Sequence, residues 1–345
     1  MTAGTASADD WSTPGAVEVS PGVHRIPLPL PNDALKAVNV YALTGPDGVD
    51  LVDSGWALAN ARDTLVDALA GLGHGLPDVR RFLVTHVHRD HYTQAVLLRR
   101  EFGMRVSLGV DERASLEESM RPDRLPMEAQ LTRLPSLGAG HLVELLGDRF
   151  RRHLDVDEPI WELPDDWLQP GTTVSAGGRN LDVVPTPGHT QGHVVFHDTD
   201  ERVLFAGDHV LPTITPSIGF EPVLSPSPLA DFLSSLARVR SRPDALLLPA
   251  HGPVAPSAHA RVDELVAHHG QRLDQTEDAV RRGSSTPFEV AGILRWTRRE
   301  RELADLDPFN RMLAVLETTA HLELLVAQGR LRTSVADGVH HFAVA

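Results

Sequence analysis

The chain has 345 residues, 41% of them hydrophobic, and a formal net charge of −15. This length allows one large domain or two, with a substantial core. The acidic excess argues against general affinity for nucleic-acid backbones or anionic membranes, and no apolar run reaches the roughly 20 residues of a membrane span. The absence of cysteine excludes disulfides, thiolate catalysis and iron–sulfur clusters, and it fits a cytoplasmic location.

The N-terminal part predicts a tail followed by strands. Residues 1–17 are small, polar and acidic and lack the basic and apolar regions of a signal peptide, so we expect a disordered tail. An edge strand is expected over 22–31, because prolines interrupt it. Strands at 38–43 and 49–52 flank a Gly-Pro-Asp-Gly turn sequence and predict a hairpin.

A dense polar cluster follows the next short apolar run. His86, His88, Asp90 and His91 fall within six consecutive positions. They cannot be ordinary core, because three imidazoles and a carboxylate so close together would each need a buried partner. These side chains are also the ligands that borderline divalent metals prefer. The stretch therefore predicts a metal site, and a helix is expected to start behind it at Thr93.

Three later apolar strands end in a similar way, at a small or turn residue followed by a polar side chain. His189, Asp208 and His251 stand at these three positions. Residues at strand ends tend to converge at one rim of a sheet, where loops form a site. We therefore expect these three side chains to join the first cluster.

Two long segments lie outside this strand pattern. Residues 111–170 are rich in leucine and proline and mostly helical, and a segment of this length predicts a lid or binding element. Residues 258–345 predict helices and a final hairpin, which resemble a winged-helix module. That segment has 11 Arg against 13 Asp and Glu, so it lacks the basic surface of a nucleic-acid reader. We expect a structural role or homodimer formation.

The polar motifs stand in a fixed order along the chain. They are His86-x-His88-x-Asp90-His91, then His189 in Thr-Pro-Gly-His-Thr-x-Gly-His, Asp208 in Gly-Asp-His, and His251 in Pro-Ala-His-Gly. This set resembles the metallo-β-lactamase fold superfamily over about residues 20–255. The resemblance implies an α/β protein: an αβ/βα sandwich at 18–257 with the helical insertion, followed by the winged-helix-like module. The arrangement is similar to the glyoxalase II-like and lactamase-beta-like 2-like branches.

The resemblance also implies a dinuclear site on the rim of the sandwich. The positions that match the first ion's ligands are His86, His88 and His189, those for the second are Asp90, His91 and His251, and Asp208 bridges the two. Zinc suits these ligands, with manganese or iron as alternatives. Asp53, which ends an earlier strand, is expected to accept a hydrogen bond from a ligand histidine, or else to cap the turn.

The chemistry would follow from the ions. Two metals about 3.5–4 Å apart can share a hydroxide whose pKa is brought toward ~7. Asp90 could then carry a proton to the leaving group. The first hypothesis is a hydrolase of a small thioester, lactone or related ester. The second is a ribonuclease or phosphodiesterase, and the third is an iron-dependent oxygen-using or redox protein.

The choice of substrate depends on what surrounds the ligands. The insertion and the loop 211–228 would form an apolar wall, which suits an acyl or lactone substrate better than a polyanion. His193, His209, Tyr92 and Phe220 are candidates for substrate contact. The alternative is a satisfied hydrogen-bonding role for the two histidines and ordinary core packing for the two aromatic residues.

Overall fold

The computed structural model describes residues 10–31, 35–125, 127–151 and 160–345. Within them, one sheet holds seven strands in chain order. These are β1 (Val17–Ser20), β2 (Val23–Pro29), β3 (Ala37–Gly45), β4 (Gly48–Val52), β5 (Val79–Val84), β6 (Arg105–Gly109) and β7 (Asp166–Leu168). Strands β1 to β4 pair antiparallel, and β4 to β7 pair parallel.

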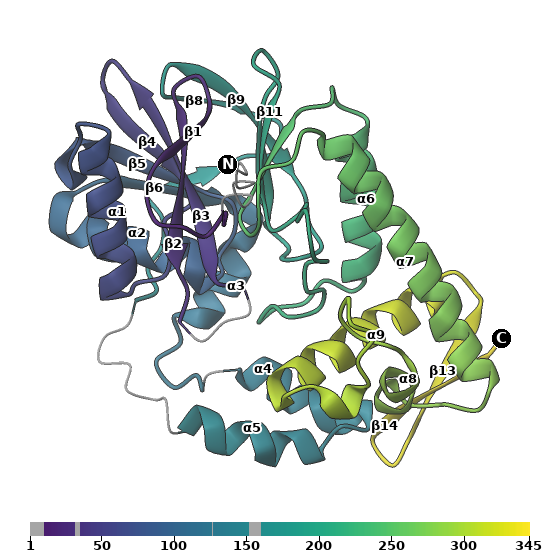
Figure 1. The fold of residues 1–345 in the computed structure, drawn as a ribbon. Helices are drawn as coiled ribbons and strands as arrows, with labels where there is room; N and C mark the ends of the chain where they lie inside the picture. The colour runs from purple at the N-terminus through teal and green to yellow at the C-terminus, as the bar shows by residue number, and fades with distance from the viewer. Residues whose placement is uncertain (1–9, 32–34, 126, 152–159) are drawn as a thin grey trace, which may run out of the picture.

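The second sheet packs against the first. Its strand order is β12 (Leu246–Pro249), β11 (Val203–Gly207), β10 (Val194–Asp198), β9 (Arg179–Pro185) and β8 (Thr173–Ala176). Helices α1 (Ala59–Gly71) and α2 (Arg89–Phe102) cover the outer face of the first sheet, and α6 (Pro228–Arg240) covers the second (Figure 1). The result is the predicted αβ/βα sandwich.

Three hydrophobic clusters correspond to the layers of this sandwich. One lies between α1, α2 and the first sheet, and another lies between the two sheets. In the second of these, the rings of Tyr41 on β3 and Phe205 on β11 meet edge to face at 5.6 Å. The third cluster joins the outer face of the second sheet to α6 and to the C-terminal helices. The C-terminal module is thus packed onto the sandwich through a shared core.

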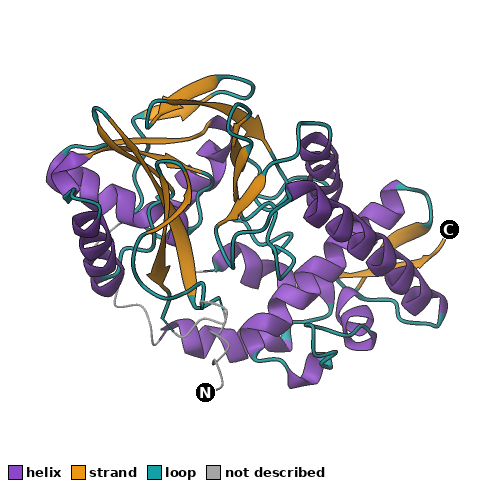
Figure 2. Cartoon of the chain, turned by 45° about the horizontal axis from the view of Figure 1, so that its top comes forward, coloured by secondary structure: helices purple, strands orange, loops and turns teal. Residues whose placement is uncertain are grey.

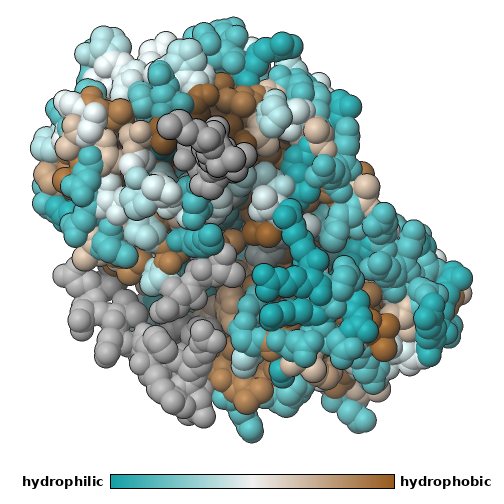
Figure 3. Space-filling model, viewed as in Figure 1, coloured by the Kyte–Doolittle hydropathy of each residue, from teal (hydrophilic) through white to brown (hydrophobic). Residues whose placement is uncertain are grey.

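The insertion and the C-terminal module form the helical half of the molecule (Figure 2). The insertion contains α3 (Arg113–Ser119), α4 (Glu128–Arg133) and α5 (His141–Arg151). The module contains α7 (Ala258–Arg281), α8 (Pro287–Ile293), α9 (Pro308–Ala327), β13 (Leu331–Ala336) and β14 (Val339–Val344). Leu134, Leu142 and other apolar residues of the insertion share the cluster of α8 and α9. The surface over this half is mostly hydrophilic in the face shown in Figure 3.

The predicted strands and the final hairpin are confirmed, with three differences. The strand at 22–31 is not an edge strand, because β1 pairs with its outer side. Helix α2 begins at Arg89 and not at Thr93, since His88 is extended and the chain turns helical directly after it. Strands β1, β7 and β10 and helix α6 were not predicted, and β7 lies inside the segment 111–170 that was expected to be mostly helical. The winged-helix comparison stays a prediction, and the expected tail lies outside the described residues up to residue 9.

Among the described residues, no helix is both long and apolar enough to cross a membrane.

The packing between the sheets can be tested at Phe205, which is 1% exposed. We expect Phe205→Ala to lower the free energy of unfolding by about 3–5 kcal/mol, because it leaves a cavity and removes the contact with Tyr41. Urea unfolding at fixed metal concentration measures this change. The control is Val335→Ala on β13, where the side chain is 63% exposed and the change should stay within about 0.5 kcal/mol. Equal effects of the two substitutions would contradict the assignment of this core.

Candidate metal centre

Four strand ends bring the predicted donors together. Strand β5 leads into the loop that carries His86 and His88, and the first turn of α2 carries Asp90 and His91. A carboxylate in the first turn also interacts favourably with the positive end of the helix dipole. The other three donors follow β9, β11 and β12, as the sequence predicted.

Close packing of the backbone at two glycines explains how these loops reach the rim. Gly188 precedes His189 and has φ +135°, and a Cβ there would lie 2.5 Å from the backbone of Phe232. Gly207 precedes Asp208 and has φ +51°, and a Cβ there would lie 2.7 Å from the Thr85 hydroxyl. Both positions need a residue without a side chain.

The first donor group contains His86, His88, His189 and Asp208, whose ligand atoms all lie within 4.8 Å of one another. His88 Nδ1 lies 3.0 Å from His86 Nε2 and 3.0 Å from His189 Nε2. His189 Nε2 also lies 3.4 Å from Asp208 Oδ2. These atoms face a common point from four sides.

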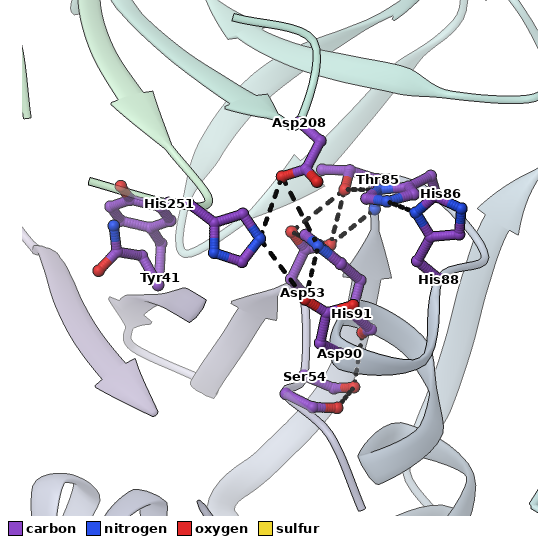
Figure 4. Close-up of polar contacts among 12 residues, drawn as sticks. Tyr41, Asp53, Ser54, Thr85, His86, His88, Asp90, His91, Asp208 and His251 are labelled. Atoms are coloured by element: carbon purple, nitrogen blue, oxygen red, sulfur yellow. Dashed lines mark hydrogen bonds and ion pairs between the residues drawn. The ribbon is translucent and has the colours of Figure 1, made fainter. Parts of the chain in front are cut away.

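The second donor group contains Asp90, His91 and His251 (Figure 4). His251 Nε2 lies 3.5 Å from Asp90 Oδ2, and His91 Nε2 lies 3.7 Å from the same oxygen. Asp208 Oδ1 is 3.4 Å from His251 Nε2 and 3.7 Å from His91 Nε2. Asp208 therefore turns one oxygen toward each group.

Hydrogen bonds behind the site fix which ring nitrogens face inward. Nδ1 of His189 donates to the Ser217 carbonyl and Nδ1 of His251 donates to the Ala37 carbonyl, both at 2.8 Å. Since a carbonyl can only accept, Nδ1 of each ring carries a proton, and Nε2 is the nitrogen left to bind an ion. Such outer contacts orient metal-bound histidines in proteins.

Asp53 provides the corresponding contact for His91. Its carboxylate accepts from His91 Nδ1 at 2.9 Å, from the Thr85 amide at 2.8 Å and from the Thr85 hydroxyl at 3.0 Å. That hydroxyl in turn lies 3.0 Å from His86 Nδ1. The structure places Asp53 where the sequence predicted, next to a candidate ligand histidine.

The donor set fits divalent ions. His88 Nδ1 faces two ring nitrogens that both carry lone pairs, so it can satisfy at most one of them by a hydrogen bond. Three further buried atoms, His91 Nε2, His251 Nε2 and Asp208 Oδ1, make no hydrogen bond with the described residues. Inward lone pairs and carboxylates without donors are what a cation would satisfy.

Four of the donors have protonation states that suit a ligand set. Burial, followed by the neighbouring imidazoles, lowers the pKa of His86 and brings the pKa of His88 to about 3, so both rings are neutral at pH 7. Burial alone would raise the pKa of Asp90 and Asp208, but the adjacent histidines lower it and keep both carboxylates charged. Burial opposes the charge on His91, yet Asp53 and the other carboxylates raise its pKa to about 10, so without an ion this ring holds a proton at pH 7 that a bound ion would displace.

The candidates for substrate contact lie in different environments. His193 is buried: its Nδ1 pairs with the Thr186 hydroxyl at 2.8 Å, and its Nε2 accepts from the Asp208 amide at 3.1 Å. It therefore supports the loop that carries Asp208. His209 is also buried and packs on the Phe232 ring at 5.1 Å.

The two aromatic candidates also differ from each other. The Tyr92 ring is buried and stacks on Trp161, and its hydroxyl donates to the Glu162 carbonyl at 2.7 Å. The half-buried Phe220 ring lies 6.0 Å from the His88 ring and 5.7 Å from the ring of Phe309 on α9. Sequence reasoning missed Phe309 and Thr85. The hydroxyl directly before the histidine motif was a usable signal for Thr85, but no pattern pointed to Phe309.

Comparison with known proteins agrees with this geometry. The model of the metallo-beta-lactamase superfamily matches residues 34–251, which include all seven donors. The chain belongs to this superfamily. A metallo-beta-lactamase family protein from Thermus thermophilus superposes with a TM-score of 0.74 at 28% identity, over 95% of this chain and 100% of that protein.

Two curated relatives are thioester-cleaving enzymes by name. Hydroxyacylglutathione hydrolase GloC from Haemophilus influenzae is 30% identical over 132 residues, 38% of this chain and 50% of its own length. Atrochrysone carboxyl ACP thioesterase nsrC from Aspergillus novofumigatus is 26% identical over 84% of this chain and 72% of its own length. For three curated relatives, GloC included, the chain spans between 38% and 60% of the relative's length. The family and the donor set together imply a hydrolase that binds divalent metal.

The role of Asp53 can be tested by comparing two substitutions. Asp53 has φ +60°, which Asn tolerates and Ala does not. We expect Asp53→Ala to weaken metal affinity about 10- to 100-fold, because His91 loses its orienting acceptor. Asp53→Asn keeps an acceptor oxygen and should lose less. Competition with a fluorescent chelator measures the affinities, and wild-type affinity in a folded Asp53→Ala variant would contradict the role of Asp53 in orienting His91.

Proposed function

We propose that the chain is a hydrolase of acyl thioesters, or of lactones and related esters. It would use two divalent ions, with zinc as the preferred metal. The observation that supports two ions is the position of Asp208. Its Oδ2 faces the His189 group and its Oδ1 faces the His251 group. A carboxylate with one oxygen toward each of two donor groups is arranged to bridge.

The residues would divide the work as follows. Bound ions would supply an activated water and a Lewis acid for the substrate carbonyl. The two donor groups would hold these ions, and Asp208 would contact both. The Asp90 side chain is 18% exposed, more than the 11% of Asp208, so it is the carboxylate of the two with the better access to solvent. It is suited to pass a proton to the leaving group.

Two features support an acyl substrate over a polyanion. The Phe220 ring lies beside His88 and packs on Phe309, so the two rings would form an apolar wall at the edge of the site. Insertion helix α4 holds this wall, since Gln130 Nε2 donates to the Phe220 carbonyl at 3.1 Å. The net charge of −15 would repel nucleic acid. The names of the relatives from H. influenzae and A. novofumigatus point in the same direction.

A substrate panel tests the proposed function. We expect the zinc-loaded chain to hydrolyse acyl-glutathione, acyl-coenzyme A thioesters or acyl-homoserine lactones, and to leave a single-stranded RNA oligomer intact. Asp208→Ala should lose at least one ion per chain and about 100-fold or more in kcat/KM, because the shared ligand is gone. Elemental analysis and steady-state kinetics provide the two readouts. RNA cleavage with inert esters, or full metal content in Asp208→Ala, would refute the corresponding part of the proposal.

The aromatic wall predicts a chain-length effect. We expect Phe220→Ala and Phe309→Ala each to raise KM for a long-chain acyl thioester about 10-fold, since an apolar contact is lost, with little change for the acetyl thioester. Phe102→Ala is the control, because that ring lies at the far end of α2 and is 37% exposed. Equal changes for long and short acyl chains would show that the wall does not contact the acyl group.

A further inference from the structure

A second cluster of histidines lies between α7 and α9 in the C-terminal module, where the two helices pack side by side (Figure 1). His268 and His269 are neighbours on α7, and Glu317 and His321 lie one turn apart on α9. One donor atom of each of His268, His269 and Glu317 lies within 4.8 Å of the other two. The proposed hydrolytic site uses none of these residues.

Hydrogen bonds fix the tautomers of the two buried rings. His321 Nδ1 lies 2.8 Å from the Glu317 carbonyl, so this nitrogen carries a proton. In the neutral form of this ring, Nε2 is then an acceptor. His269 Nδ1 lies 3.2 Å from that Nε2 and must therefore donate. The lone pair of His269 is left on Nε2.

This lone pair has no hydrogen-bond donor. His269 is 0% exposed, and its Nε2 makes no hydrogen bond with any described residue. A buried acceptor without a donor is destabilising unless another group satisfies it. A divalent ion would do so. The hydrogen bond from Nδ1 to His321 is the kind of outer contact that orients a metal-bound imidazole.

Glu317 offers a carboxylate that is not otherwise engaged. Its half-buried side chain makes no hydrogen bond or ion pair with the described residues. Burial raises the pKa of Glu317, and the charge of Arg272 opposes this shift. That guanidinium donates to the Arg295 carbonyl at 2.9 Å and lies over the Trp296 ring at 4.1 Å. Arg272 is thus held by other groups, and the Glu317 oxygens remain available.

We propose that His268, His269 and Glu317 form a further metal site, which takes a divalent ion such as zinc and joins α7 to α9. Two imidazoles and a carboxylate are zinc ligands in proteins. His268 is exposed, so an ion reaches the site from solvent and keeps a position for water. A site with three protein ligands and one coordination position for water suits an ion that exchanges with solvent. Because the ion would bind only the folded helix pair, it would stabilise the module.

Counting ions in the full chain tests this site. The protein is stripped with a chelator, dialysed against zinc and analysed by elemental mass spectrometry. We expect three ions per chain in the wild type and one fewer in Glu317→Gln and in His268→Gln. Both variants should also show a smaller rise in Tm on loading. His86→Ala should lose an ion from the hydrolytic site and keep this one, so the two kinds of site are counted separately.

A matched control lies one turn away. Glu264→Gln removes a negative charge as Glu317→Gln does, but from the exposed face of α7, so the count should stay at the wild-type value. Far-UV circular dichroism of the metal-free variants checks that they fold. If Glu317→Gln does not fold, His268→Gln is the test variant, because His268 lies at the surface. An ion count in the folded variant equal to that of the wild type would overturn the proposal. If the wild type binds this third ion but hydrolyses no ester or thioester, the result contradicts only the proposed hydrolase function.

Discussion

The charge arrangement at the strand rim is the constraint on which the rest of the structure depends. Five imidazoles and two carboxylates share this rim, and groups of this kind are costly to bury without partners. The fold offsets the cost from behind, where the Asp53 carboxylate and the carbonyls of Ala37 and Ser217 accept from outward ring nitrogens. The inward atoms face one another and need a cation. The metal requirement therefore follows from burial, as well as from the identity of the ligands.

One carboxylate orients a histidine from each donor group. Asp53 accepts directly from His91, and it accepts from the Thr85 hydroxyl, which lies against His86. This linkage is possible because β4 and β5 are adjacent parallel strands, so the residues after their ends lie side by side. The strand order of the first sheet thus ties the two donor groups together. Asp53 takes a left-handed backbone conformation at this point, which aims its side chain across to the neighbouring strand end.

The sequence could predict the donors because their signal is local. Each donor follows a short apolar run, and residues after strand ends meet at one rim. The helix start at Arg89 escaped prediction because His88 to His91 read equally well as a loop. The backbone acceptors escaped for another reason. The carbonyl of Ala37 reaches His251 across the fold, and carbonyls leave no residue pattern. Phe309 lies on a separate module, so only the packing of that module could place it against Phe220.

The C-terminal module is connected to the site through two routes of side-chain contact. On the outside, Phe309 at the start of α9 packs on Phe220, which lies beside His88. In the interior, His209 packs on Phe232 of α6, and Phe232 packs on His269 of α7 at 5.4 Å. Both routes run through the cluster that joins the second sheet to the C-terminal helices.

A rearrangement of α7 against α9 would therefore reach the metal centre from two sides. Phe232 contacts both His209 and His269 in the interior route. Gly188 also packs closely against the backbone of Phe232. The loop that carries His189 thus rests on the same helix that contacts the module. The loops of the metal centre and the C-terminal helices are thus packed on one continuous core.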